Sequence, residues 1–205
     1  IVNGEAVNEI YASKLGDFRN WNSFAGLSTD SYAASRGSDG VFTGAAACMG
    51  GVIFFKEDCM ERVYPSAAGA HQIVTVRCPG IRKGCGGSAA LVDGTLFYVG
   101  VNGVYAFDGS MPSCVSQPLG SVRYAGAAAA GWNGQYWLAA RDEAGGRHVL
   151  VYDTAHGLWH RQDDADIMAF AVCGGALYGL TRSGALLDLT GGSGEPEETV
   201  RWMAE

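Results

Sequence analysis

The chain has 205 residues, 48% of them hydrophobic and 17% charged, so it can bury a core and does not belong to the disordered class. Its 31 glycines follow no collagen period, which favours an all-β fold with many turns. The net charge of −7 and the scattering of the 14 basic residues argue against a nucleic-acid partner, and the absence of any apolar run of about 18 residues argues against a membrane span.

The N-terminal stretch 1–42 is predicted to form part of one structural unit, followed by a loop. Residues 9–13 read as a strand, and residues 17–24 read as a turn and an outer strand that contains Trp21. Residues 25–42 fit no repeat and are expected to form a loop that covers one face. Because long loops in compact domains often carry function, Tyr32 is a candidate for contact with a partner.

The clearest strand pattern lies in the middle of the chain. Asn102-Gly103 separates two apolar runs, which is a strong hairpin signal because both residues tolerate positive φ. Asp93-Gly94 marks another turn just upstream. The predicted antiparallel strands cover 88–92, 95–99 and 104–108. Asn102, at the tip of this hairpin, is a second candidate for contact with a partner.

The same pattern recurs along the chain. The middle strand of each unit carries an aromatic residue, at Phe54, Phe97, Trp137 and Tyr178. The unit therefore repeats about every 40 residues, which is typical of propeller blades with several strands each. Four-stranded units are predicted near 43–78, 87–117, 124–162 and 167–204. The alanine-rich run at 125–130 is predicted to be an innermost strand rather than a helix, since Gly126 and Gly131 flank it.

These units predict one all-β domain over residues 1–205, a β-propeller of four-stranded antiparallel blades. An open ring exposes strand edges and apolar faces. The ring is therefore expected to close. It has five blades if residues 1–24 complete a blade with residues near Glu205. Otherwise the chain is an excerpt of a six- or seven-bladed ring.

No metal or cofactor site is predicted. His156 and His160 are four residues apart, but in a strand that spacing separates them by about 13 Å, too far for one metal ion. The acidic run at 163–166 lacks the Gly and the distal Glu of a calcium loop, so it is predicted to be solvated. Lys56-Glu57-Asp58 is likewise predicted to be a solvated turn.

The six cysteines form no Cys-x-x-Cys pair, and their irregular spacing in a chain of this size favours reduced, packed thiols. No Gly-x-Ser-x-Gly elbow is present, and no acid, base and nucleophile converge in the pattern, so no enzyme is predicted. Trp21, Trp159 and Trp202 occupy equivalent outer-strand positions and are predicted to pack between blades. Trp132, on a predicted turn, is the candidate for an exposed aromatic that contacts a ligand.

Two resemblances follow from these motifs. Gly174-Gly175 before Leu177-Tyr178, together with the spacing from Tyr152 to Trp159, resembles kelch-type blades. The chain also resembles propeller domains of bacteriophage and prophage virion proteins from the tail or neck. This resemblance lies in a succession of segments: 13–21, 52–58, 94–98 with 103–109, and 151–159.

The second resemblance implies a non-enzymatic assembly role in a virion that is put together in the bacterial cytoplasm. Its implied partners are other virion proteins, including other copies of the chain, with no nucleic acid, membrane or cofactor. In this view loops such as 25–42 and 78–87 dock neighbouring subunits. The alternative is a propeller that binds a glycan or another ligand in host attachment.

Overall fold

The computed structural model describes residues 8–14, 16–22, 32–64 and 71–190, and within these ranges the chain is all-β apart from one 3₁₀ turn, η1 (Gln117–Leu119). Its strands form five antiparallel sheets that follow one another along the chain. Three sheets have four strands each, one has three and one has two.

The strands fall into sheets in chain order. The first sheet consists of β1 (Glu9–Ala12) and β2 (Tyr32–Ser35), and the second consists of β3 (Gly44–Cys48), β4 (Gly51–Phe55), β5 (Cys59–Tyr64) and β6 (Gln72–Arg77). The third sheet consists of β7 (Ala90–Val92), β8 (Thr95–Gly100), β9 (Gly103–Phe107) and β10 (Ser113–Cys114). The fourth sheet consists of β11 (Tyr124–Trp132), β12 (Gln135–Asp142), β13 (Arg147–Asp153) and β14 (Leu158–Asp163), and the last consists of β15 (Ile167–Cys173), β16 (Ala176–Thr181) and β17 (Leu186–Asp188).

Each sheet from the second onward is a meander, in which every strand pairs with the next one in the chain. The predicted repeat of strands is therefore confirmed, including a strand rather than a helix over the alanine-rich run. The hairpin between the first two strands of each unit carries two successive residues with positive φ, at Met49-Gly50, Asp93-Gly94, Asn133-Gly134 and Gly174-Gly175. Such tight turns match the twist of the strands that they join.

The turn at Asn102 differs from its prediction. Gly100 pairs with Gly103, so the two connecting residues are Val101 and Asn102, and neither has positive φ. Gly103 itself has a φ of 140°, and a Cβ there would lie 2.3 Å from the hydroxyl of Ser116. That hydroxyl accepts a hydrogen bond from the Val104 N–H at 2.8 Å, so the close approach requires glycine.

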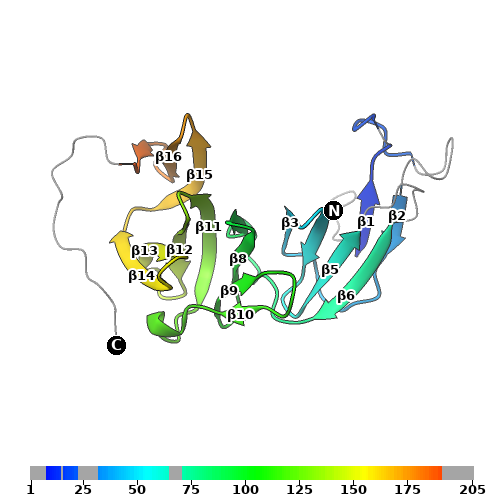
Figure 1. Ribbon diagram of the computed structural model, residues 1–205, viewed down its shortest axis with the longest axis horizontal. Coiled ribbons are helices and arrows are strands. Elements are labelled where there is room, and N and C mark those ends of the chain that lie inside the picture. The colour runs from blue at the N-terminus through cyan, green and yellow to red at the C-terminus, as the bar shows by residue number, and fades with distance from the viewer. Residues whose placement is uncertain (1–7, 15, 23–31, 65–70, 191–205) are drawn as a thin grey trace.

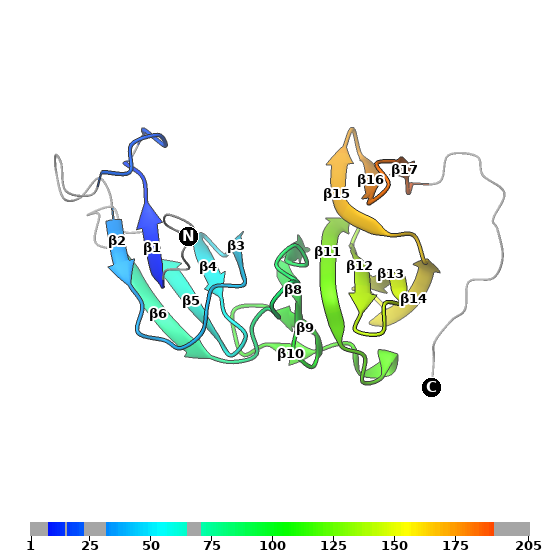
Figure 2. The same cartoon turned by 180° about the vertical axis from the view of Figure 1, so that it is seen from behind.

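The sheets follow one another around an open arc (Figures 1 and 2), with β1–β2 on one arm and β15–β17 on the other. The first strands of the third, fourth and last sheets lie together, because β7 packs against β11 and β11 packs against β15. Gly87 forms a parallel bridge with Ala128, and its carbonyl accepts a hydrogen bond from the Ala129 N–H at 2.8 Å. The small residues of β11 allow this close approach.

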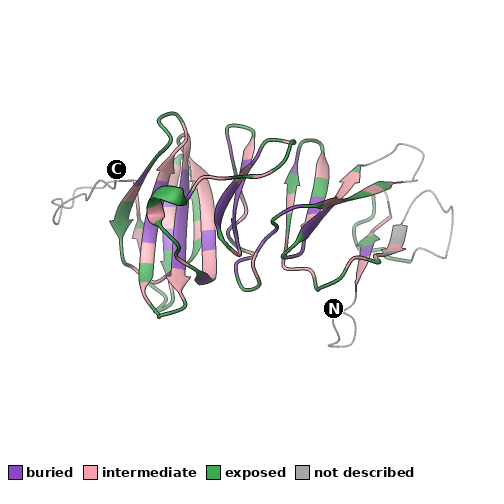
Figure 3. Cartoon of the chain, turned by 90° about the horizontal axis from the view of Figure 1, so that it is seen from below, coloured by how far each residue is buried: buried purple, intermediate pink, exposed green. Residues whose placement is uncertain are grey.

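The largest apolar core runs across the second, third and fourth sheets, and Figure 3 shows buried positions along all three. Adjacent residues in a strand face opposite sides of the sheet. Tyr98 accordingly packs against Phe55 of the second sheet, with ring centroids 5.0 Å apart, while Phe97 stacks on Tyr136 of the fourth sheet at 5.3 Å. The third sheet is therefore covered on both faces.

Trp159 packs between the third and fourth sheets, which confirms its predicted position between units. It is 1% exposed, and its indole N–H donates to the carbonyl of Val115 at 2.8 Å. The same prediction is wrong for Trp21, which is 56% exposed. Trp202 lies outside the described residues, as does the predicted last strand at 200–203.

The first unit is built differently from its prediction. β1 pairs with β2, which lies inside the stretch that was expected to be a loop. Residues 16–22 contain turns and one isolated bridge at Asp17 but no strand, and residues 23–31 lie outside the described residues. Tyr32 begins β2 opposite Ala12; its side chain is not among those that the structure describes.

Lys56 is fully buried, contrary to the prediction of a solvated turn. Its ammonium group donates to the carbonyl of Ser38 at 2.6 Å and lies 5.0 Å from the centre of the Phe42 ring. Both partners come from the segment after β2, which folds over the second sheet. The charge is buried because a carbonyl and an aromatic face replace its water.

The connector at 78–87 is more deeply packed than a docking loop. Ile81 and Cys85 are fully buried, and the Tyr98 hydroxyl donates to the carbonyl of Pro79 at 2.7 Å. A Cβ on Gly80 would lie 1.9 Å from the carbonyl oxygen of Lys56. Much of this connector therefore fills the space between the second and third sheets, and Lys83 and Gly84 form its exposed tip.

The cysteines are free, and four of them are buried: Cys48, Cys59, Cys78 and Cys85. Burial raises the pKa of Cys78 and of Cys85 to about 11. Cys173 is exposed at the β15–β16 turn, and Cys114 is half-buried.

We therefore expect one thiol of the native protein to react rapidly with a disulfide reagent at pH 8, because thiolate and access are both needed for reaction. The Cys173→Ser variant should lose this fast phase, and urea should release all six thiols of the wild-type protein. A wild-type protein that shows fewer than six thiols when denatured without reductant would contain a disulfide, contrary to this expectation.

Candidate anion-binding site

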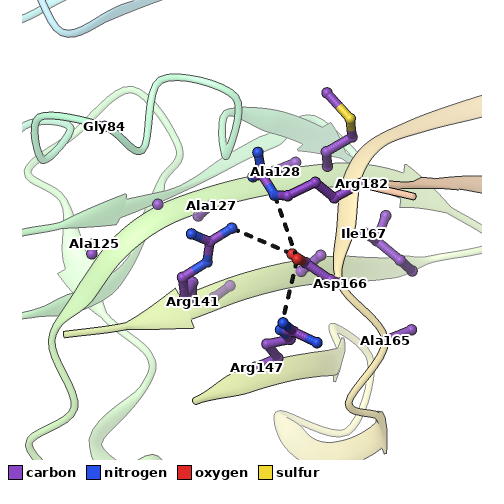
Figure 4. Close-up of a pocket in the computed structure, with 14 residues that line it drawn as sticks. Gly84, Ala125, Ala127, Ala128, Arg141, Arg147, Ala165, Asp166, Ile167 and Arg182 are labelled. Atoms are coloured by element: carbon purple, nitrogen blue, oxygen red, sulfur yellow. Dashed lines mark hydrogen bonds and ion pairs between the residues drawn. The ribbon is translucent and has the colours of Figure 1, made fainter. Parts of the chain in front are cut away.

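A cavity of about 340 Å³ lies between the fourth and last sheets. Alanines form much of its wall, at 125, 127 and 128 on β11 (Figure 4) and at 139 and 140 on β12. Their methyl groups are too small to fill the space between the sheets. Polar side chains enter the cavity from the ends of β12 and β16, the start of β13 and the segment before β15.

Asp166 holds the centre of this group of polar side chains (Figure 4). Its carboxylate oxygens lie 3.5 Å from Nη2 of Arg141, 3.6 Å from Nε of Arg147 and 3.4 Å from Nε of Arg182. Its backbone carbonyl accepts a hydrogen bond from the Arg182 N–H at 2.8 Å. We call these four residues the arginine cluster. The cluster connects the fourth sheet to the last one.

The charges of the arginine cluster do not balance. Three guanidinium groups, which stay protonated in proteins, face one carboxylate, so the cluster carries two net positive charges. The arginine side chains are 42–59% exposed, whereas Asp166 is 20% exposed. Each ion pair alone contributes little to stability because solvent screens it. The arrangement is nevertheless suited to an anion that enters the cavity.

The sequence did not single out the three arginines, because isolated basic residues looked scattered. One signal was present: Arg141 and Arg182 occupy equivalent places in successive units, where the second strand of each unit ends. The acidic run at 163–166, which includes Asp166, is predicted from the sequence to be solvated. That holds for Asp163 and Asp164, which are exposed, but not for Asp166.

The three residues predicted to contact partners do not come together. Trp132 ends β11, where its indole N–H donates to the carbonyl of Gly175 at 2.8 Å and its ring meets Trp137 edge-on at 6.2 Å. It is half-buried and ties two sheets together rather than standing free on a turn. Asn102 is exposed and borders two cavities of about 290 and 390 Å³, and Tyr32 lies in the first sheet.

His156 and His160 lie in different surroundings. His156 is exposed, and its Nδ1 lies 2.9 Å from Asp153 across a turn. His160 is half-buried in β14, and this burial lowers its pKa. Among the described residues, no group of three or more His, Cys, Asp or Glu side chains has the arrangement to hold a metal ion.

Within the ranges that the structure describes, no helix has the length and hydropathy to cross a bilayer. The chain matches no protein-family model and no curated protein.

Proposed function

We propose that the chain forms a β-propeller of about five blades, or part of a six- or seven-bladed ring. Three features support this architecture. The sheets are successive meanders, the first strands of the third, fourth and last sheets lie side by side, and Gly87 forms a parallel bridge with Ala128. The described sheets form an open arc (Figure 1), so further strands are needed to close a ring.

We further propose that this propeller is a non-enzymatic docking platform in a phage or prophage virion, in the tail or neck. The observation that carries the docking role is the contrast between the central and end sheets. The third sheet is covered on both faces, whereas the last sheet exposes Met168, Val172 and Leu186 by 48%, 52% and 66%. Apolar side chains left exposed in this way are available for contact with another sheet or another protein. The virion assignment is supported by the resemblance of the sequence motifs.

The virion assignment is tested on particles induced from a bacterium that carries the gene. After density-gradient purification, quantitative mass spectrometry should find the chain in intact particles in constant ratio to the major capsid protein. A deletion strain, used as the matched control, should yield particles that lack a tail or neck. Particles that are complete and infectious without the chain would contradict the proposal.

A ligand-binding propeller is the second candidate function, and the cavity with its arginine cluster favours it. A glycan array probed with the full chain separates the two candidates. A specific and saturable signal on one sugar class would contradict a purely structural role.

A further inference from the structure

We propose that the cavity at the arginine cluster binds a small oxyanion, with the carboxylate, phosphate or sulfate group held by Arg141, Arg147 and Arg182. This inference deepens the ligand-binding candidate by naming the chemical class of the ligand. It does not depend on the docking role, because the cavity lies between two sheets of the same chain.

The first argument is the looseness of the contacts to Asp166. Charge-assisted hydrogen bonds between a guanidinium and a carboxylate are normally about 2.7–2.9 Å long. Elsewhere in this chain such pairs reach that length, at 2.8 Å for Arg36 and Glu61 and 2.7 Å for Arg77 and Asp58. The three contacts to Asp166 are 3.4–3.6 Å long, and only the one from Arg141 meets the geometry of a hydrogen bond.

The second argument is the number of donors that remain. A guanidinium carries five N–H donors, and three such groups converge on two carboxylate oxygens that cannot serve all of them well. Among the described residues, the carboxylate that each of these guanidinium groups contacts is that of Asp166. All three arginines line the cavity, and Figure 4 shows their guanidinium groups converging on Asp166. An entering oxyanion would find planar, paired donors, the geometry that favours arginine in such sites.

The third argument is the size and lining of the cavity. Small-molecule sites are commonly about 300–1,000 Å³, so a cavity of about 340 Å³ suits a ligand with few atoms. Its alanine side chains offer apolar contact without hydrogen-bonding groups of their own. The arginines therefore determine which ligand is accepted, and Asp166 competes with that ligand for their donors.

Isothermal titration calorimetry on the full chain in low salt tests the inference, with sodium phosphate, sodium sulfate and glucuronate as probes and glucose as the neutral control. At least one anion should bind with a stoichiometry of one, and binding should weaken in concentrated NaCl because salt screens the attraction. Saturation by glucuronate alone would identify a carboxylate ligand, and saturation by phosphate or sulfate alone would identify an inorganic-type oxyanion. Failure of all three anions, or equal heats with glucose, would overturn the inference.

Variants assign any binding to the cluster. Arg141→Gln and Arg182→Gln should each weaken it about tenfold or more, because each removes charge-assisted hydrogen bonds. Arg77→Gln, a matched change on the second sheet, should leave it unchanged. Equal effects of Arg77→Gln and Arg141→Gln would place the anion elsewhere and refute the proposal. The arginines are at least 42% exposed, so these variants should fold.

Asp166→Asn gives a result that a purely structural ion cluster would not. Removing the internal carboxylate should tighten anion binding about threefold or more, since it frees donors and adds positive charge to the cavity. Weaker binding in a variant whose thermal unfolding remains cooperative would contradict the role of Asp166 as a competitor. If the variant does not fold, the arginine variants decide. The composition of purified particles tests the docking role separately, so failure of one proposal leaves the other standing.

Discussion

The Phe97→Ala variant is expected to lose about 3–5 kcal/mol of unfolding free energy. Phe97 is 3% exposed on β8, and its ring contacts two residues of the next sheet, with centroids 5.3 Å from Tyr136 and 5.6 Å from Tyr152. Truncation would leave a cavity between the two sheets, because the other side chains packed between them hold the sheets apart. Equilibrium unfolding in urea measures the loss.

Phe18→Ala is the matched control, because Phe18 is 74% exposed. Its effect should stay within about 0.5 kcal/mol. Phe97→Leu keeps most of the apolar volume and secures a folded variant for comparison, with an expected loss of about 1–1.5 kcal/mol. A loss below about 1 kcal/mol for Phe97→Ala would mean that the ring does not support the contact between the third and fourth sheets.

Glu61→Gln should destabilise the chain by about 2–4 kcal/mol at pH 7. The Glu61 side chain is fully buried on β5 and accepts hydrogen bonds from Nε and Nη2 of Arg36 at 3.1 and 2.8 Å, from Ser38 at 2.7 Å and from Thr75 at 2.9 Å. Without its charge, the Arg36 side chain, only 20% exposed, loses its counter-ion. Asp58→Asn is the control, because its pair with Arg77 is exposed and worth under about 1 kcal/mol.

The stabilisation that Glu61 provides should decrease as the pH falls. Burial alone raises the pKa of Glu61, but the hydrogen bonds from Ser38, Arg36 and Thr75 and the charge of Arg36 outweigh it, so the pKa lies below its ordinary value. The stabilisation is therefore complete above the pKa of the unfolded chain, about 4.3, and is lost as the pH falls through the folded value. Urea titrations should show the wild type and Glu61→Gln converging in acid; a gap that widens would contradict this assignment.

Local patterns predicted the strands well because they depend on neighbouring residues. Alternating apolar residues and tight turns such as Asp93-Gly94 fix where a strand begins and ends whatever surrounds it. The turn at Asn102 shows the limit of such reasoning. Its conformation depends on Ser116, which reaches Gly103 and Val104 from beyond the following strand.

The pairing of β1 with β2 and the burial of Lys56 were also missed. Both depend on how the segment after β2 folds over the second sheet, where Ser38 meets Lys56 and Glu61. A charged residue in a turn is solvated by default, and only a specific carbonyl and ring nearby make its burial favourable. Nothing in the sequence around Lys56 indicates those partners.

The sequence by itself determined the all-β class, the repeated unit of strands and the aromatic residues that separate the sheets, since each follows from strand alternation and the spacing of turns. Only the tertiary structure decided which charged groups meet. Asp166 contacts arginines from three other segments because the packing of the last sheet against the fourth brings the ends of their strands together. Attraction between charges acts through space, so the cavity and its excess of positive charge exist only once the sheets have packed.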